Sequence, residues 1–259
     1  MNWLQELFIT YEGKDLTNTD KIKGATQAEI KRLEKLSGET LPDDYRLFLE
    51  ICGNKLPSFI DTSDISLEIS ELISQYELTL EEEPDEMPES EWLIVAVWNM
   101  TGAEWVLNTV SGEVYDRDEY GEMLLKVTDS FQKIIHQHAF TYYKLHQSKY
   151  VKSVSSGTSD LEKKYNEIDG DQLRDLVVQC LRRHNLSILD ISDIRKQCAS
   201  GDHIYFTNTL YLEESPDNSI KKVGGIPFKV GGEIEAEVIA LAEDMRELIG
   251  AARINDVQT

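Results

Sequence analysis

The sequence has few cysteines and no long apolar run, and its first residues do not lead us to expect a signal peptide. Cys52, Cys180 and Cys198 lie far apart and form no C-x-x-C pair, which argues against a disulfide framework and against a thiolate zinc site. The longest apolar run, Trp92 to Trp98, is far shorter than the roughly 20 residues that a membrane-spanning helix requires. The N-terminus has neither the basic region nor the cleavage site of a signal peptide. We therefore expect a cytoplasmic protein.

Basic residues are scarce relative to acidic ones. The 259-residue chain has 48 aspartates and glutamates against 26 lysines and arginines, a formal net charge of -22. This charge makes nonspecific attraction to a nucleic acid or an anionic membrane unfavourable, so we expect neither as a partner. Residues 1–150 hold 29 acids and 13 bases, whereas residues 151–259 hold 19 and 13. The acidic excess belongs mainly to the first half, which favours a neutral or basic protein partner.

Hydrophobic spacing predicts an α+β fold for the first half. Helical periodicity starts at Trp3, and Thr26-Gln27-Ala28-Glu29 forms a capping box that opens a second helix. A third helix follows Leu41-Pro42, because proline in the first turn loses no hydrogen bond. Two prolines and mutual charge repulsion predict a loop over residues 61–91. Strands are expected at Trp92 to Trp98, Glu104 to Asn108 and Glu113 to Tyr115, with a closing helix from Ser130.

A serine-rich segment predicts a linker at residues 148–159, between a first domain at 1–147 and a second at 160–259. The second half is expected to be a smaller α+β module. Its helix order and the basic Arg182-Arg183-His184 also fit a winged helix, although its net negative charge opposes nucleic-acid binding. Expected elements are helices at 161–168, 172–184, 191–198 and 233–249, strands at 203–212 and 220–230, and a turn at 215–218.

The predicted helix pair of the first half holds a characteristic set of residues: Ile30, Leu33-Glu34, Gly38, Leu41-Pro42-Asp43-Asp44-Tyr45, Phe48-Leu49 and Gly53-Asn54. This set resembles the opening of the SUKH superfamily, which includes fungal cell-wall assembly regulators and bacterial toxin-immunity proteins. Gly112-Glu113-Val114-Tyr115 and Ser130-Phe131 agree with the later part of the family, so the resemblance covers about residues 24–145. One departure is Gly53-Asn54, where the family often places asparagine before glycine. No part of residues 160–259 resembles a known family.

The resemblance implies a SUKH-like antiparallel sheet flanked by helices and a binding function without catalysis. Bacterial members of this kind serve in polymorphic toxin systems, where the immunity protein neutralises a cognate toxin, often a nuclease, by occluding its active site. The alternative is a regulatory scaffold like the fungal members, which binds cellular proteins. The resemblance provides no catalytic residues, and no feature of the sequence indicates an enzyme. The oligomeric state stays open.

An acidic stretch is the sharpest candidate for a binding surface. A nuclease groove must be positive to hold phosphates, and clustered carboxylates complement such a groove. The alternative is a solvated loop without a partner. The candidate partner-binding residues are Glu81, Glu82, Glu83, Asp85, Glu86, Glu89 and Glu91.

No metal site or cofactor is predicted from residue spacing. His136 and His138 lie two positions apart on a predicted helix, so their side chains diverge and cannot share one metal ion. Lys222-Val223-Gly224-Gly225 and Gly231-Gly232 lack the order of a phosphate-binding loop and are better explained as turns. Trp92, Trp98 and Trp105 could stack on a ligand, but strand spacing favours packing in the core.

Overall fold

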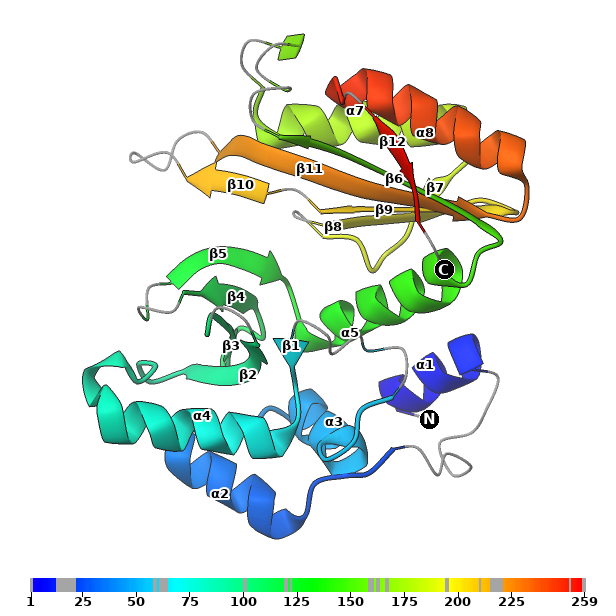
Figure 1. Ribbon diagram of the computed structural model, residues 1–259. Helices are drawn as coiled ribbons and strands as arrows, with labels where there is room; N and C mark the ends of the chain where they lie inside the picture. Colours follow the sequence, from blue (N-terminus) through cyan, green and yellow to red (C-terminus); the bar gives the residue numbers. More distant parts are fainter. Residues whose placement is uncertain are drawn as a thin grey trace. The chain divides into compact units, whose positions relative to one another are not determined.

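The chain forms two compact units, Met1–Ala139 and Phe140–Thr259, each built around its own antiparallel sheet (Figure 1). This arrangement confirms the expected α+β class. No helix within the described residues is long and apolar enough to cross a membrane. The computed structural model describes residues 2–12, 22–57, 60, 65–99, 102–118, 121, 123–157, 161, 164–165, 168–193, 196–209, 211–214, 221–251 and 253–257.

Unit 1 opens with the helices that local sequence signals predict. They are α1 (Trp3–Glu12), α2 (Gln27–Ser37) and α3 (Asp43–Cys52). The capping box at α2 is present, since Thr26 Oγ1 accepts from the Glu29 amide at 3.2 Å and Glu29 Oε2 accepts from the Thr26 amide at 2.7 Å. Gly38 ends α2 in the left-handed region with φ 76°, a conformation that glycine adopts without steric cost.

The sheet of unit 1 has the strand order β1-β2-β3-β4-β5. Every pairing is antiparallel, and a bulge interrupts the β2–β3 register between Ile94 and Ala96. The central strands β2 and β3 are the most apolar, and most of their side chains are buried. Helix α5 (Phe131–Phe140) follows the last strand, as expected. The strands are β1 (Ile65–Ser66), β2 (Trp92–Trp98), β3 (Glu104–Asn108), β4 (Val114–Arg117) and β5 (Met123–Thr128).

The predicted loop over residues 61–91 is wrong in its central part. Residues Ile69–Glu82 form the 14-residue helix α4, and Pro84–Glu86 form a 3-10 turn, η2. The apolar residues of α4 recur at helical spacing, and Ile69, Leu72, Ile73 and Tyr76 are all buried. Burial of this face stabilises the helix despite its acidic end, and both prolines lie beyond its last residue.

Unit 2 is a seven-stranded antiparallel sheet with two long helices. Strand order is β12-β6-β11-β9-β8-β7, and β10 pairs with β11. Helices α7 and α8 lie on the same side of the sheet (Figure 1). The elements are the π-helical turn η3 (Thr141–His146), β6 (Tyr150–Gly157), α7 (Gly170–Arg183), β7 (Ser187–Ile188), β8 (Lys196–Ser200), β9 (Ile204–Thr209), β10 (Tyr211–Glu214), β11 (Lys221–Gly232), α8 (Glu235–Ile249) and β12 (Ile254–Asp256).

The segment expected as a linker at 148–159 instead holds a strand. Its residues 150–157 form β6, which pairs with β11 over eight positions and with β12 on its other edge. Val151, Val154 and Ser156 are buried, and the Ser156 hydroxyl donates to the carbonyl oxygen of Ile249 at 2.9 Å. Serine is small enough to pack beneath α8, so a serine-rich composition does not distinguish a buried strand from a linker.

Two other expectations for the second half need correction. A helix was expected at 191–198, but its last residues belong to strand β8. Cys198 and Ala199 of this strand are buried, and β8 lies between β9 and β7 in the sheet. The winged-helix alternative is wrong as well, because the helices of unit 2 pack on a large antiparallel sheet. The turn expected at 215–218 and much of the helix at 161–168 lie outside the described residues.

Candidate functional site

Helix α4 positions the first of the acidic candidates. The Tyr76 hydroxyl accepts a hydrogen bond from the Ile94 amide at 2.8 Å, which ties the helix to β2. Gln75 Nε2 donates to Glu104 Oε1 at 3.0 Å, which adds a link to β3. Because buried polar contacts with defined geometry fix a helix against a sheet, the C-terminal end of α4 has a defined place in unit 1.

The seven predicted acidic residues occupy three consecutive pieces of structure. Glu81 and Glu82 end α4, Glu83 precedes η2, Asp85 and Glu86 lie within it, and Glu89 and Glu91 lead from η2 into β2. Glu86 is half-buried, and the other six residues are exposed. We call residues 81–91 the acidic segment. Tertiary structure thus brings all seven carboxylates into one continuous, exposed stretch.

A buried arginine holds the middle of the acidic segment. Arg117, on β4, is 6% exposed and donates to the backbone carbonyl oxygen of Glu86. Its guanidinium also donates to Glu104 Oε2 at 2.6 Å and to the carbonyl oxygen of Gly121 at 3.1 Å. These contacts satisfy the buried charge and fix the backbone of the acidic segment to the sheet. The segment is therefore attached at its centre by a hydrogen bond from a buried arginine that is itself ion-paired with Glu104.

The far end of the acidic segment is also fixed by hydrogen bonds. Glu91 has a positive φ of 74°, unusual for a residue with a side chain. Its amide donates to Glu39 Oε1 at 2.9 Å, and its carbonyl oxygen accepts from the Thr109 amide at 2.8 Å. These bonds connect the segment to the chain before α3 and to the turn after β3.

The electrostatics of the acidic segment are dominated by like charges. Desolvation together with the neighbouring Glu83 raises the pKa of Glu86. No lysine or arginine within the described residues forms an ion pair with any of the seven carboxylates. The last turn of α4 also has no basic residue, so Glu81 and Glu82 lie at the negative end of the helix dipole. A cationic partner would relieve both kinds of repulsion.

Exposed leucines accompany these acids on α4. Leu78 is 50% exposed and Leu80 is 44% exposed, although helix residues of their kind are usually buried. Leu78 precedes Glu81 and Glu82 by three and four positions, which places the three side chains on one face of the helix. Sequence analysis missed these leucines because it predicted a loop rather than a helix. The acidic surface therefore includes apolar area.

The histidine and tryptophan candidates take packing positions in unit 1. His136 packs against Trp3 and His138 against Trp105, with ring centroids 6.0 Å apart in each pair. Trp105 is buried and meets Trp98 edge to face at 5.8 Å. These contacts account for the aromatic residues without a bound ligand.

One cluster in unit 2 has the donor atoms of a metal site. Cys180 and His184, four positions apart at the end of α7, meet Asp244 of α8 with their potential ligand atoms within 4.8 Å of one another. His184 Nε2 already hydrogen-bonds Asp244 Oδ2 at 2.9 Å, and Arg183 lies 3.9 Å from the same oxygen. Burial raises the pKa of Cys180, which opposes the thiolate form that metals bind. The cluster is explained as a polar contact between two helices.

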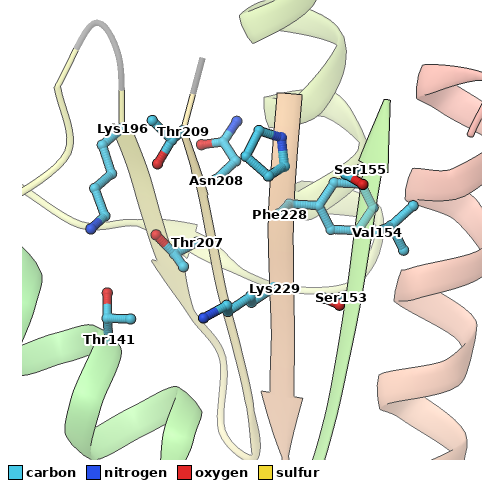
Figure 2. A pocket seen from close by; sticks show the side chains of 11 residues that line it. Thr141, Ser153, Val154, Ser155, Lys196, Thr207, Asn208, Thr209, Phe228 and Lys229 are labelled. Carbon is cyan, nitrogen blue, oxygen red and sulfur yellow. The ribbon is translucent and has the colours of Figure 1, made fainter. Parts of the chain in front are cut away.

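Unit 2 also contains a cavity of about 320 Å³ on its sheet (Figure 2). Lys196 of β8 and Lys229 of β11 line it, with Thr207 of β9 between them. The hydroxyl residues Thr141, Ser153 and Ser155 add further polar groups to the lining, and none of the lining residues that the structure describes is acidic. Sequence analysis missed this cavity because its lysines are 33 positions apart, and only strand pairing brings them together.

Comparison with known proteins identifies the first unit. Residues 24–137 match the SMI1 / KNR4 family (SUKH-1), and the rest of the chain matches no family. No curated protein matches the chain. The matched residues run from the capping box of α2 through the five-stranded sheet into α5, and they include the acidic segment and its anchor Arg117. Residues 24–137, most of unit 1, are therefore similar to the SMI1 / KNR4 family (SUKH-1).

Proposed function

We propose that this protein is a non-catalytic, immunity-like protein that binds a basic bacterial toxin and neutralises it by occluding its active site. The contact surface is the acidic segment, residues 81–91, of the SUKH domain. The observation that carries the proposal is the attachment of this segment through Arg117 to the sheet. A surface that is already ordered loses less conformational entropy on binding, so its carboxylates act as a formed site.

Charge complementarity supports a basic partner. Residues 1–139 contain 29 acidic and 11 basic residues, a net charge of 11 − 29 = −18, and unpaired carboxylates are concentrated between Glu81 and Glu91. Opposite potentials accelerate encounter and select among partners, acting over about 8 Å in physiological salt. A toxin whose active site binds phosphates has the positive groove that this segment complements.

The exposed apolar residues of α4 support a protein partner over a small ion. Leu78 and Leu80 lose water contact only if another surface covers them, and protein interfaces combine an apolar centre with a polar rim. Leu78 beside Glu81 and Glu82 provides both kinds of contact on one helix face. An isolated cation would leave the leucines exposed.

The proposal is tested by charge reversal on the full-length chain. Glu81→Lys with Glu82→Lys replaces two negative charges of the acidic segment by two positive ones, and the matched control, Asp175→Lys with Glu247→Lys, makes the same change at exposed positions of α7 and α8. Each variant is used to purify partners from the native host, and its association rate with the co-purified partner is then measured. The comparison separates the effect of charge in the acidic segment from the effect of the net charge of the protein.

We expect the wild type and the control to retain a basic toxin and the acidic-segment variant to associate more slowly, most strongly at low salt. Addition of the wild-type protein should abolish the toxin's activity. Recovery of a cellular, non-toxin protein would favour the regulatory alternative, and equal association rates for both variants would remove the acidic segment from the interface.

A further inference from the structure

One face of the sheet in unit 2 is polar because of its strand register. Residues directly opposite one another in paired strands point to the same face. Thr207 of β9 lies opposite Lys229 of β11, and Lys229 lies opposite Ser153 of β6. On the other side of β9, Thr209 lies opposite Lys196 of β8. These five residues share one face, whereas Phe206, Phe228 and Val154 are buried on the face that α7 and α8 cover.

Among its described lining residues, the cavity on this polar face has two lysines and no carboxylate. Figure 2 shows the Lys196 and Lys229 side chains directed toward the same side of the sheet, with Thr207 between them and Thr141 facing them from η3. The surrounding chain is acidic overall, and even residues 140–259 contain 19 acids against 15 bases, a net charge of 15 − 19 = −4. A basic cavity is therefore opposite in sign to the rest of the protein.

Lys196 has no partner for its charge. No hydrogen bond or ion pair within the described residues involves its ammonium group. Desolvation, with added repulsion from Lys229, lowers the pKa of Lys196. Removing an ammonium group from water without a partner costs free energy, because lost hydration is not replaced. An anion in the cavity would compensate this cost.

Lys229 contacts a histidine at the edge of the cavity. Its Nζ lies 3.0 Å from Nε2 of His146 on η3, within hydrogen-bond distance. This contact orients the Lys229 side chain and involves no carboxylate. Within the described residues neither lysine forms an ion pair, and an anion in the cavity would favour the charged form of both.

We propose that this cavity binds a small phosphorylated molecule, with its phosphate between Lys196 and Lys229 and within reach of the hydroxyl groups of Thr207, Ser153 and Thr141. The donor set favours phosphate over carboxylate. Lysine acts as a point charge with three donors, whereas planar carboxylates are best matched by the fork of arginine, and the described residues that line the cavity include no arginine. Pro227 adds apolar lining for the organic part of the ligand.

The size of the cavity agrees with this ligand class. Its volume of about 320 Å³ lies at the lower end of the range of about 300–1,000 Å³ that is usual for small-molecule sites. A phosphate ester of a few carbon atoms fits such a volume. This site lies in the unit without a family match, and it is independent of the toxin contact proposed for unit 1.

Titration calorimetry on the full-length chain tests the proposal with inorganic phosphate, glycerol 3-phosphate and, as the carboxylate counterpart, glycerate. We expect saturable binding of glycerol 3-phosphate at one molecule per chain, with glycerate binding weaker. Lys196→Gln should weaken glycerol 3-phosphate binding about tenfold or more, the usual loss for a charged hydrogen-bond donor. Lys152→Gln is the matched control, because Lys152 pairs with Asp256 outside the cavity lining.

Thermal unfolding with and without phosphate shows whether a variant that binds weakly is still folded. Lys196→Gln removes an unpartnered charge, so without ligand it should unfold at or above the wild-type temperature, and added phosphate should stabilise it less than the wild type. Thr207→Val, similar in shape, should also weaken binding. The proposal is overturned if neither phosphate compound binds saturably, if Lys196→Gln binds as the wild type does, or if glycerate binds as tightly as glycerol 3-phosphate. Charge reversal in the acidic segment should leave this binding unchanged.

Discussion

At the scale of single residues, Arg117 connects three separate parts of unit 1. Its guanidinium joins Glu104 of β3, the turn at Gly121 and the backbone of the acidic segment at Glu86. The side chains of Arg117 and Glu104 are 7% and 4% exposed. Burial raises the pKa of Glu104, and the contact with Arg117 only partly opposes that shift. Loss of one partner would therefore leave the other as an uncompensated buried group.

Arg117→Met should lower the free energy of unfolding by about 3–5 kcal/mol, because it leaves the Glu104 carboxylate buried without a cation. The double variant Arg117→Met, Glu104→Met should recover much of this loss, since neither charge remains. Urea denaturation of the wild type, both single variants and the double variant measures the coupling. A loss of less than about 1 kcal/mol in Arg117→Met would contradict the role assigned to this ion pair.

The same variant should show a defined pH dependence. Without Arg117 the pKa of Glu104 rises further above its value in the unfolded chain, so the unfolded state ionises first as pH increases. Stability contributed by the protonated carboxyl is present at low pH and lost as pH rises through the folded-state pKa. The stability difference between Arg117→Met and the wild type should thus shrink from pH ~7 to pH ~5, as urea midpoints at the two pH values would show.

At the scale of elements, α2 and α4 illustrate two sources of helix stability. Helix α2 begins at a capping box in which Glu29 Oε2 accepts from the Thr26 amide at 2.7 Å and from Asn54 Nδ2 at 2.9 Å. These bonds lower the pKa of Glu29, with the Thr26 amide as the largest cause. Helix α4 lacks a side-chain cap at Glu68, and its buried face stabilises it instead.

Thr26→Ala should destabilise the protein by about 1 kcal/mol, the usual value of an N-cap hydroxyl.

Glu29→Gln should lose less stability than the wild type does when the pH is lowered. Because the folded-state pKa of Glu29 is depressed, its contribution is present above the ordinary glutamate pKa and is lost as pH falls through the folded-state value. Urea midpoints between pH ~6 and pH ~3 compare the variants with the wild type; Ser74→Ala on the exposed face of α4 is the control. Identical acid profiles for Glu29→Gln and the wild type would argue against this contribution.

At the scale of the whole molecule, the position of β6 determines where the second unit begins. The boundary between compact units lies between Ala139 and Phe140, within a continuous helical run formed by α5 and η3. Strand β6 lies inside the sheet of unit 2, with β11 on one side and β12 on the other. A fragment that starts at residue 160 lacks this strand, whereas one that starts at residue 140 keeps it.

We expect the fragment 140–259 to fold cooperatively and the fragment 160–259 to be unfolded or aggregated. Removal of β6 exposes unpaired edges on both β11 and β12 and uncovers the face of α8 that packs on β6. Circular dichroism and thermal unfolding of the two fragments provide the measurement. A cooperative transition in 160–259 would show that β6 is dispensable and would support the boundary expected from composition.

The sequence by itself determined the elements with strong local signals. The capping box at Thr26, the proline before α3 and the apolar run of β2 each specify their structure within a few residues, and the SUKH resemblance follows from the same residues. The acidic candidates were also visible in the sequence, because clustered charge is a property of neighbouring positions. Their role as a partner surface stays a proposal.

Only the tertiary structure decided the features that depend on distant residues. Helix α4 is stable because its apolar face packs in the core, although its acidic end suggested a loop, and Arg117 reaches the acidic segment from a later strand. Strand β6 exists because β11 and β12, more than 60 positions away, pair with it. The cavity lysines meet for the same reason: register between strands, rather than spacing along the chain, brings Lys196 and Lys229 to one face.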